Sequence, residues 1–144
     1  MFIGQHTHKL DEKSRLSVPK KFREKLGGTV VVTHGLDQCL FVYTLQEWEQ
    51  FSYKMSELSM GQADTRAFTR YMLSSAVEVD IDKSGRVLIP DFLRDHAGLT
   101  ENVIVAGVHN RIELWNEDAW QEYISSVTKR ADTLAERLGD IGML

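Results

Sequence analysis

Apolar and polar residues alternate in two short stretches on either side of a polar turn. Over residues 77–81 every second side chain is apolar, and the alternation resumes over residues 87–89. A period of two places one side of a segment against a core, so this pattern predicts a pair of strands. Ser84 and Gly85 suit the tight reversal between them.

The sequence repeats itself approximately after 71 residues. Residues 11–19 overlie residues 82–90, Arg23 falls on Arg94, and the chain's only two prolines are partners in the overlay. The apolar positions coincide as well: Leu10, Leu16, Val18, Phe22 and Leu26 fall on Ile81, Val87, Ile89, Leu93 and Ala97. Internal repetition of this kind indicates that each half forms one structural unit.

A short helix is predicted after each strand pair. Pro19 and Pro90 end the second strand and suit the first position of a helix, where a missing amide hydrogen costs nothing. Phe22 and Leu26 then recur one turn apart, and Gly27 ends the helix after about two turns.

Two further elements complete each unit. Residues 30–33 and 39–43 predict a second strand pair, joined by a loop that contains Gly35. Thr44 and Glu47 form a capping box. A helix is expected behind it, because large apolar residues recur at helical spacing: Trp48, Phe51, Met55 and Leu58.

A long amphipathic helix is predicted near the C-terminus. Asn116 takes the capping position, and apolar residues follow at steps of four and three: Trp120, Ile124, Val127, Ala131, Leu134 and Leu138. We expect this stripe to pack within the chain. A coiled coil between subunits is the less favoured alternative, because the stripe covers fewer than three heptads.

These elements predict an α+β chain of two repeats. The first repeat covers residues 1–58, a helical connector covers 59–75, and the second repeat with its C-terminal helix covers 76–144. We expect the two repeats to form one compact unit.

Composition narrows the class of protein. The chain has 144 residues, of which 42% are hydrophobic and 26% charged, as in ordinary globular proteins. No apolar stretch approaches the ~18 residues of a membrane span, and the N-terminus meets polar residues early, so the protein is expected to remain in the cytoplasm. Cys39 is the only cysteine, which excludes an internal disulfide and a multi-thiolate zinc site.

Charge is distributed unevenly along the chain. The net charge is -4, yet residues 1–27 hold seven basic side chains against three acidic ones, and the rest of the chain carries the opposite excess. The basic side chains are Lys9, Lys13, Arg15, Lys20, Lys21, Arg23 and Lys25. Because salt screens distant charges over ~8 to 10 Å, a DNA backbone would meet this local excess. A solvated charged face remains the alternative.

The doubled motif resembles a known family. Asp11-x-x-x-Arg15 and Asp82-x-x-x-Arg86, each in a turn followed by a strand, a proline and a short helix, resemble the DxxxR signature of the MraZ family. The opening Met1-Phe2-Ile3-Gly4 and the segments 9–19 and 79–90 are also similar to it. The resemblance covers essentially the whole chain.

The resemblance implies a fold and a function. The expected fold is mainly β: a double-repeat, AbrB-like swapped-hairpin barrel with a short helix after each hairpin and a longer C-terminal helix. The expected function is sequence-specific regulation of transcription, with repression of the chain's own division and cell wall gene cluster. The family also implies a cytoplasmic, nucleoid-associated location and ring-like homo-oligomers that bind tandem repeats in promoter DNA. No cofactor, catalytic residue or small-molecule substrate is expected.

The candidate DNA-binding residues have distinct expected roles. Asp11 and Asp82 should accept hydrogen bonds from their own turns and orient Arg15 and Arg86, which can contact guanine or phosphate bidentately. Sequence-independent phosphate contacts suit the lysines, namely Lys9, Lys13, Lys20, Lys21 and Lys83. Residues 79–98 carry three basic side chains against four acidic ones, so the first turn is expected to dominate on DNA. The second turn is expected to contribute mainly Lys83 and Arg86, or contacts between subunits.

Two metal sites were weighed against this interpretation. Residues 80–85 match the opening of an EF-hand loop, but Asp91 stands where the bidentate Glu belongs and Pro90 obstructs the exiting helix. His6 and His8 alternate on one predicted strand and could hold a metal with His34 or Cys39, although exposed strand histidines are commoner. No metal is therefore expected.

Two other classes of function were considered. An enzyme is disfavoured, because the sequence has no phosphate-binding glycine loop and no nucleophile elbow, and Cys39 lies among apolar neighbours. An oligomeric protein-interaction scaffold without DNA contact is the serious alternative, built through Trp48, Trp120 and their helices. Salt dependence separates the two, since only a DNA binder loses affinity as counterions compete.

Overall fold

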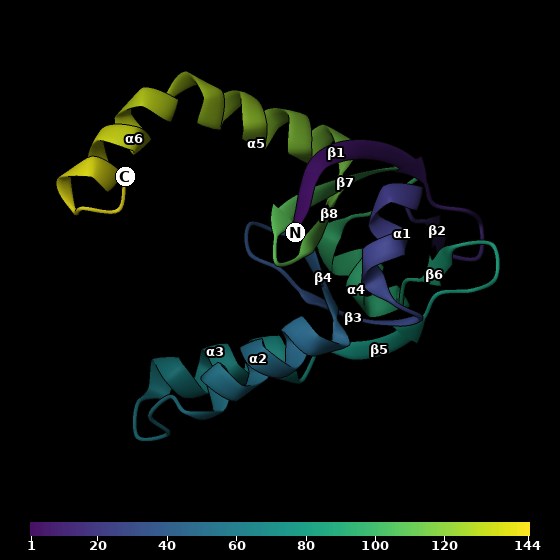
Figure 1. The fold of residues 1–144 in the computed structure, drawn as a ribbon, viewed down its shortest axis with the longest axis horizontal. Coiled ribbons are helices and arrows are strands. Elements are labelled where there is room, and N and C mark those ends of the chain that lie inside the picture. Colours follow the sequence, from purple (N-terminus) through teal and green to yellow (C-terminus); the bar gives the residue numbers. More distant parts are fainter.

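The computed structural model describes residues 1–144 and contains a six-stranded antiparallel sheet, a two-stranded ribbon and six helices (Figure 1). The strands are β1 (Phe2–Lys9), β2 (Arg15–Ser17), β3 (Thr29–His34), β4 (Leu40–Thr44), β5 (Val77–Asp80), β6 (Arg86–Leu88), β7 (Asn102–His109) and β8 (Ile112–Asn116). The helices are α1 (Lys20–Leu26), α2 (Leu45–Ser56), α3 (Ala63–Leu73), α4 (Asp91–Ala97), α5 (Glu117–Lys129) and α6 (Ala131–Asp140). This composition confirms the α+β class.

The two repeats exchange strands. The short strand β2 of the first repeat pairs with β6 of the second, with Leu16 opposite Val87. The long strands leave for other partners: β1 pairs with β7 along its whole length, and β5 pairs with β3. Within each repeat, the expected strand pair is reduced to one bridge beside the turn, Leu10 with Leu16 and Ile81 with Val87.

This exchange agrees with the swapped hairpins that the family resemblance implies. A lone two-stranded hairpin is marginal in water, because one of its faces has nothing to pack against. Here the arms of both hairpins part beyond the turn, and each short strand lies against its counterpart from the other repeat. Neither repeat is a complete unit by itself.

The larger sheet does not close into a barrel. Its strand order is β1-β7-β8-β4-β3-β5, and β1 and β5 stand at its two edges. The ribbon of β2 and β6 forms a separate sheet beside it. The expected barrel is therefore not closed by hydrogen bonds.

One face of the larger sheet packs on residues that the two repeats supply in parallel. A cluster of 18 buried residues includes Leu16 and Val87 from the ribbon and Phe22 and Leu93 from α1 and α4. These are pairs that the 71-residue overlay brings together. The repeat thus predicts the core correctly, although it does not predict which strands pair.

The other face of the larger sheet is covered by the longer helices. A second cluster of seven buried residues contains Cys39, Tyr43 and Trp115. The two helical tryptophans, Trp48 and Trp120, pack against it and are partly buried. Both are therefore packed within the chain, where the scaffold alternative needed them on an outer surface.

Helix boundaries agree with most of the sequence signals. The Thr44 hydroxyl accepts a hydrogen bond from the Glu47 amide (3.1 Å), and the Asn116 side chain accepts one from the Ala119 amide (2.9 Å). Both predicted caps are confirmed. Pro19 stands one position earlier than expected, as the capping residue of α1.

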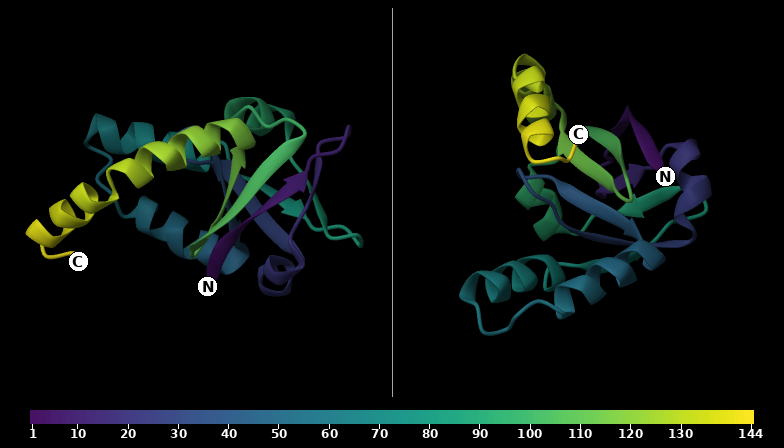
Figure 2. Two further views of the ribbon diagram at one scale, coloured as in Figure 1. Left: turned by 90° about the horizontal axis from the view of Figure 1, so that it is seen from above. Right: turned by 60° about the vertical axis from the view of Figure 1, so that its left-hand side comes forward.

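The predicted C-terminal helix is wrong in two respects. It is broken at Arg130 into α5 and α6, and neither part contains a buried residue. Figures 1 and 2 show α6 extending away from the sheets, so most of its apolar stripe does not pack within the chain. None of the helices combines the length and apolar character that crossing a membrane requires.

Candidate nucleic-acid interface

The first turn (residues 11–15) is organised by the carboxylate of Asp11. Its Oδ1 accepts hydrogen bonds from the amides of Lys13 and Arg15, each at 2.9 Å. Its Oδ2 accepts one from Nε of Arg15 at 2.7 Å. Arg15 contacts Asp11 through Nε alone, so its two terminal amino groups remain available to an external acceptor.

The second turn (residues 82–86) repeats this arrangement. The Asp82 Oδ1 accepts hydrogen bonds from the amides of Ser84 and Arg86, each at 2.9 Å, and Oδ2 accepts one from Nε of Arg86 at 3.0 Å. The turn-structuring role predicted for the two aspartates thus agrees with the geometry. Two arginines are held in the same way by the same kind of turn.

Hydrogen bonding keeps both aspartates ionised. The pKa of Asp11 lies below its ordinary value, chiefly because its carboxylate accepts the Arg15 amide hydrogen bond. The pKa of Asp82 is lowered for the same reason by the Arg86 amide. Each turn therefore retains its carboxylate, and with it the orientation of its arginine, at neutral pH.

The strand exchange brings the two turns together at one end of the molecule. The amide of Ile89 donates to the carbonyl of Ser14 (2.8 Å), and the amide of Val18 donates to the carbonyl of Gly85 (2.9 Å). The Arg86 Nη1 also lies 3.9 Å from the Asp11 carboxylate. Figure 1 shows both loops projecting from the side that carries β2 and β6.

Each turn is supported by an arginine from the other repeat, which the sequence analysis missed. Arg94 of α4 donates from Nη1 to the Ser14 hydroxyl (2.6 Å). Arg23 of α1 covers Gly85 so closely that an added Cβ there would collide with its guanidinium. The 71-residue overlay could have indicated this supporting role, because it pairs Arg23 with Arg94 and Ser14 with Gly85.

The predicted lysines differ in their availability. Lys9 lies at the end of β1 and forms an exposed ion pair with Glu101 (3.1 Å), so part of its charge is already matched. The other four lie outside the strands, are exposed and form no ion pair within the chain: Lys13, Lys20, Lys21 and Lys83. Lys13 and Lys83 stand on the turns themselves, beside the two arginines.

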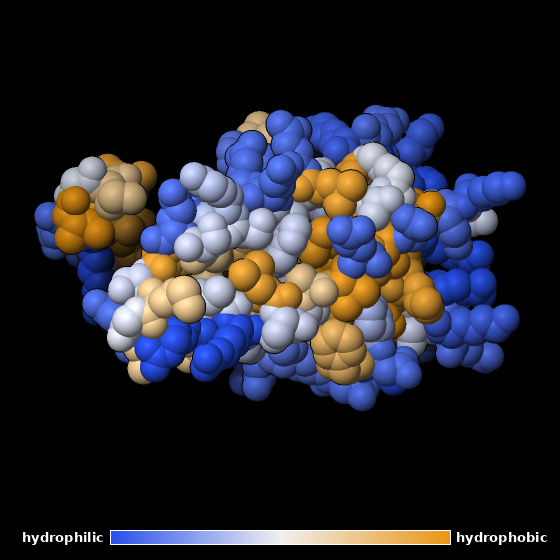
Figure 3. Space-filling model, turned by 90° about the horizontal axis from the view of Figure 1, so that it is seen from below, coloured by the Kyte–Doolittle hydropathy of each residue, from blue (hydrophilic) through white to orange (hydrophobic).

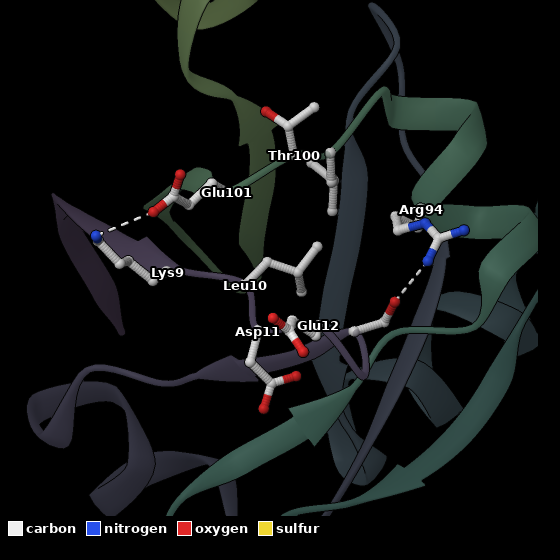
Figure 4. Close-up of a pocket in the computed structure, with 9 residues that line it drawn as sticks. Lys9, Leu10, Asp11, Glu12, Arg94, Thr100 and Glu101 are labelled. Carbon is white, nitrogen blue, oxygen red and sulfur yellow. Dashed lines mark hydrogen bonds and ion pairs between the residues drawn. The ribbon is translucent and has the colours of Figure 1, made fainter.

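An open groove of about 730 Å³ flanks the first turn (Figure 4). Its lining includes the acidic side chains of Asp11, Glu12 and Glu101 together with Lys9 and Arg94. Figure 4 shows Lys9 directed at Glu101, whereas Arg94 donates a hydrogen bond to the Ser14 hydroxyl. Acidic and basic side chains are mixed in this groove. The projecting turns are therefore better suited than the groove to binding the negatively charged phosphates of DNA.

The residues weighed as metal ligands are engaged elsewhere. His8 donates from Nδ1 to the Ser17 carbonyl (2.8 Å), and His34 stacks on His96 with ring centroids 4.1 Å apart. Asp80 accepts a hydrogen bond from the Thr29 hydroxyl (2.8 Å). The structure contains no group of three or more His, Cys, Asp or Glu side chains placed to hold a metal ion.

Cys39 has the character of a core residue. Its side chain is fully buried, and burial raises the pKa of its thiol far above the ordinary value. A thiol that stays protonated is a poor nucleophile. The geometry thus gives no support to a catalytic cysteine.

Comparison with known proteins decides the family. The family model for MraZ protein matches twice, over residues 1–71 and 72–140. The chain belongs to the MraZ family. The two matches place one copy of the family's unit on each repeat, as the 71-residue overlay predicts.

Individual relatives named "Transcriptional regulator MraZ" agree over the full length. The protein from Thermoanaerobacter sp. (strain X514) is 46% identical over 143 residues, which cover 99% of this chain and 100% of the relative. The proteins from Oenococcus oeni and Pediococcus pentosaceus are 43% and 46% identical with the same coverage. MraZ relatives are named as regulators of transcription and not as enzymes, which confirms the expectation that this chain is not an enzyme.

Proposed function

We propose that this chain is a transcriptional regulator that binds promoter DNA through its two turns, residues 11–15 and 82–86. The Asp11–Arg15 and Asp82–Arg86 pairs present two arginines at one end of the molecule. An arginine held at Nε can still donate two parallel hydrogen bonds to guanine or phosphate. Repression of the chain's own division and cell wall gene cluster is the regulatory outcome we propose.

The observation that carries this proposal is the joining of the two turns by the strand exchange. Hydrogen bonds link each turn to the opposite repeat, through the carbonyls of Ser14 and Gly85. These hydrogen bonds fix the positions of Arg15 and Arg86 before DNA binds. Less conformational entropy is then lost on binding than if the two turns moved independently.

Assembly compensates for the small contact area of one chain. A single pair of turns carries few basic groups, so one chain alone should bind weakly and with strong salt dependence. We propose ring-like homo-oligomers on tandem promoter repeats, in which later contacts become intramolecular. Avidity of this kind raises affinity by ~100-fold or more without any new contact.

The proposal also covers location and organisation. A regulator of this kind acts in the cytoplasm at the nucleoid. We propose the division into repeats over residues 1–58 and 76–144, joined by the connector 59–75, which holds α3. The two repeats act as one unit, because their strands interlock.

Binding to the DNA upstream of the protein's own gene tests the proposal. We expect wild-type protein to shift this fragment in a mobility assay and to lose affinity as salt rises, with a log-log slope of about -0.9 per phosphate contact. Arg15→Ala should weaken binding about tenfold or more, since a bidentate pair contributes ~1 to 3 kcal/mol. An unrelated fragment of equal length reports the non-specific component.

Lys129→Ala provides the matched control. Lys129 lies at the exposed end of α5. Its replacement by Ala also removes one positive charge, but the affinity of this variant for the promoter fragment should stay near that of wild type. If the folded Arg15→Ala protein holds the promoter as tightly as this control, the proposal is wrong. A wild-type protein that does not shift the promoter fragment even at low salt would instead indicate the protein-interaction scaffold.

A further inference from the structure

Three aromatic rings meet where the two repeats and the connector join. His34, the last residue of β3, contacts Tyr71 of α3 with ring centroids 4.7 Å apart. It also contacts His96 of α4 with centroids 4.1 Å apart and a tilt of 34° between the rings. The histidine pair, His34 and His96, therefore joins an element of the first repeat to an element of the second.

Hydrogen bonds define the form in which His96 is held. The Tyr71 hydroxyl has a single hydrogen, which it donates to the carbonyl of Gly35 (2.8 Å). Its oxygen lies 3.3 Å from Nε2 of His96, so it accepts the hydrogen that this nitrogen carries. His96 is therefore held as the neutral ring with its hydrogen on Nε2, and a further proton would enter at Nδ1.

The surroundings of the histidine pair disfavour a positive charge. Nδ1 of His34 is buried and has no hydrogen-bond partner. Neither histidine forms an ion pair with a carboxylate. Burial lowers the pKa of His96, and the neighbouring His34 lowers it further. Protonation of this pair in acid therefore works against the contact between the rings.

The groups on α3 and in the β3–β4 loop offer the histidine pair no counter-charge. Burial raises the pKa of Tyr71, and it raises the pKa of the Cys39 thiol far above the ordinary value, so both are neutral. The one carboxylate of the loop, Asp37, and the one carboxylate of α3, Asp64, are exposed and form no ion pair. The arginines of α3 line the groove beside α2: Arg66 and Arg70.

Helix α4 links the histidine pair to the first turn. Arg94, two residues before His96, donates from Nη1 to the Ser14 hydroxyl (2.6 Å). The two carboxylates of α4, Asp91 and Asp95, form ion pairs with Arg94 and not with His96. A shift of α4 relative to β3 therefore changes the hydrogen bond at Ser14.

The histidine pair lies at a distance from the turns. Thr29 begins β3 opposite Asp80, which leads into the second turn, whereas His34 ends the strand. A strand of six residues spans about 17 Å. Figure 3 shows hydrophilic side chains gathered at the end of the molecule that carries the turns, on the right of the view. An effect of the histidine pair on DNA binding is therefore transmitted through the protein.

We propose that the histidine pair is a pH-sensitive contact that holds α4 against β3 at neutral pH and weakens DNA binding in mild acid. This regulates the turns of the proposed function and rests on that function. A charged His96 is partly exposed and can turn toward water, which ends its contact with His34. Leu93 and Ala97 stay in the core, so α4 shifts without leaving its place and the loss of affinity is moderate.

The pH range follows from the direction of the shift at His96. Its pKa in the folded chain lies below the ordinary value of 6.5. The stabilising effect of the neutral ring is therefore complete above that value and is lost progressively as the pH falls below it. Asp11 and Asp82 stay ionised over this range, because their pKa values lie below 3.8. The turns thus keep their own hydrogen bonds while the histidine pair is protonated.

Promoter affinity at about pH 7.5 and about pH 5.5 tests the proposal. We expect wild type to lose about fivefold between the two, and His96→Gln about twofold or less, because Gln donates to Tyr71 without titrating. Loss of a positive charge alone would make His96→Gln the weaker binder in acid, so tighter binding than wild type at the lower pH identifies the contact.

His109→Asn is the matched control. His109 is an exposed imidazole outside the pair, and its φ of 63° is one that Asn tolerates. This variant should lose as much promoter affinity in acid as wild type.

A measurement without DNA tests the contact and its transmission. Nuclear magnetic resonance follows the histidine rings and the Ser14 amide as the pH falls. In wild type the Ser14 amide should shift with the midpoint of His96, and in His96→Gln it should not. His34→Phe keeps an aromatic ring without a charge, so it should raise the pKa of His96.

Three results would each overturn the proposal. They are equal acid losses in wild type and His96→Gln, a Ser14 amide that does not follow His96, and an unchanged pKa of His96 in His34→Phe. A wild-type protein that binds the promoter at neither pH would overturn the proposed function instead. The resonance measurements would then still show whether the histidine pair acts on the first turn.

Discussion

Asp11 and Asp82 each divide their two oxygens between the backbone and an arginine. One oxygen accepts two amide hydrogen bonds that shape the turn, and the other accepts Nε of Arg15 or Arg86. The same carboxylate therefore fixes the loop and aims the side chain. Removing it would free the arginine as well as loosen the turn.

The two arginines should contribute unequally to DNA binding. Arg86 is shared between Asp82 and Asp11, whereas Arg15 is hydrogen-bonded to Asp11 alone. We expect Arg15→Ala to cost about tenfold or more in promoter affinity, and Arg86→Ala clearly less. Fluorescence anisotropy with a labelled promoter fragment measures both. Equal losses in two folded variants would contradict this asymmetry.

Acid should loosen the turns through their aspartates. Since the pKa of each carboxylate is lowered by folding from an ordinary value of 3.8, its stabilising effect is complete above that value and is lost as pH falls through the folded pKa. We expect the melting temperature of wild type to exceed that of the Asp11→Asn, Asp82→Asn double variant at about pH 5. The gap should narrow toward about pH 3.

Differential scanning calorimetry of the two proteins across this range checks the sign. Glu101→Gln serves as the control, because Glu101 is an exposed carboxylate whose partner is a lysine and not a backbone amide. A gap that widens as the solution becomes more acidic would be inconsistent with the lowered pKa values.

At the scale of elements, each turn depends on a helix of the other repeat. Arg94 of α4 holds Ser14, and Arg23 of α1 covers Gly85. Ser14 and Gly85 occupy equivalent positions, both with a positive φ, of 59° and 77°. Ser14 shows that this backbone conformation tolerates a side chain. Whether position 85 also tolerates one therefore depends on the space beneath Arg23.

Gly85→Ala should therefore destabilise the protein. The added methyl would force the Arg23 guanidinium aside in a left-handed turn, and we expect a loss of about 1 to 3 kcal/mol in the free energy of unfolding. Urea denaturation measures this loss. Gly28→Ala is the control, because a Cβ there meets nothing within 4 Å, and its effect should stay within about 0.5 kcal/mol.

Local sequence patterns predicted most elements but not their partners. The alternation over residues 77–81 and 87–89 identified two strands correctly, and the caps at Thr44 and Asn116 fixed two helix starts. Strand pairing across the repeats leaves no such signal, because β1 and β7 lie about 100 residues apart along the chain. The helix break at Arg130 could not be predicted from the apolar pattern either, because the helical spacing of apolar residues continues through it.

The geometry of the two turns was easier to predict than the strand pairing around them, whereas the DNA-binding role of their residues stays a prediction. The doubled Asp-x-x-x-Arg motif located both turns, and the geometry agrees with the roles assigned to Asp11 and Asp82. The supporting contacts of Arg23 and Arg94 were missed, because a charged side chain on a short helix predicts only exposure. The tertiary contact that orients each one comes from the opposite repeat.

At the scale of the whole molecule, the only thiol reports on global unfolding. Cys39 is fully buried in the cluster between the sheet and the longer helices, and its pKa is raised by burial. We expect a thiol reagent at about pH 8 to react with the native protein far more slowly than with protein in denaturant. Absorbance of the released reagent follows the reaction. Native and denatured samples that react at equal rates would show that this cluster opens readily.

The interlocked strands β2 and β6 have a consequence for a chain that is cut in two. Severed within the connector, each piece would keep its motif but lose the strand that covers it, and so should remain unfolded alone. Brought together, the pieces hold every partner they need. Fragment complementation should therefore restore the native form from two halves that are each inert, and a gene truncated after its first repeat would encode no functional remnant.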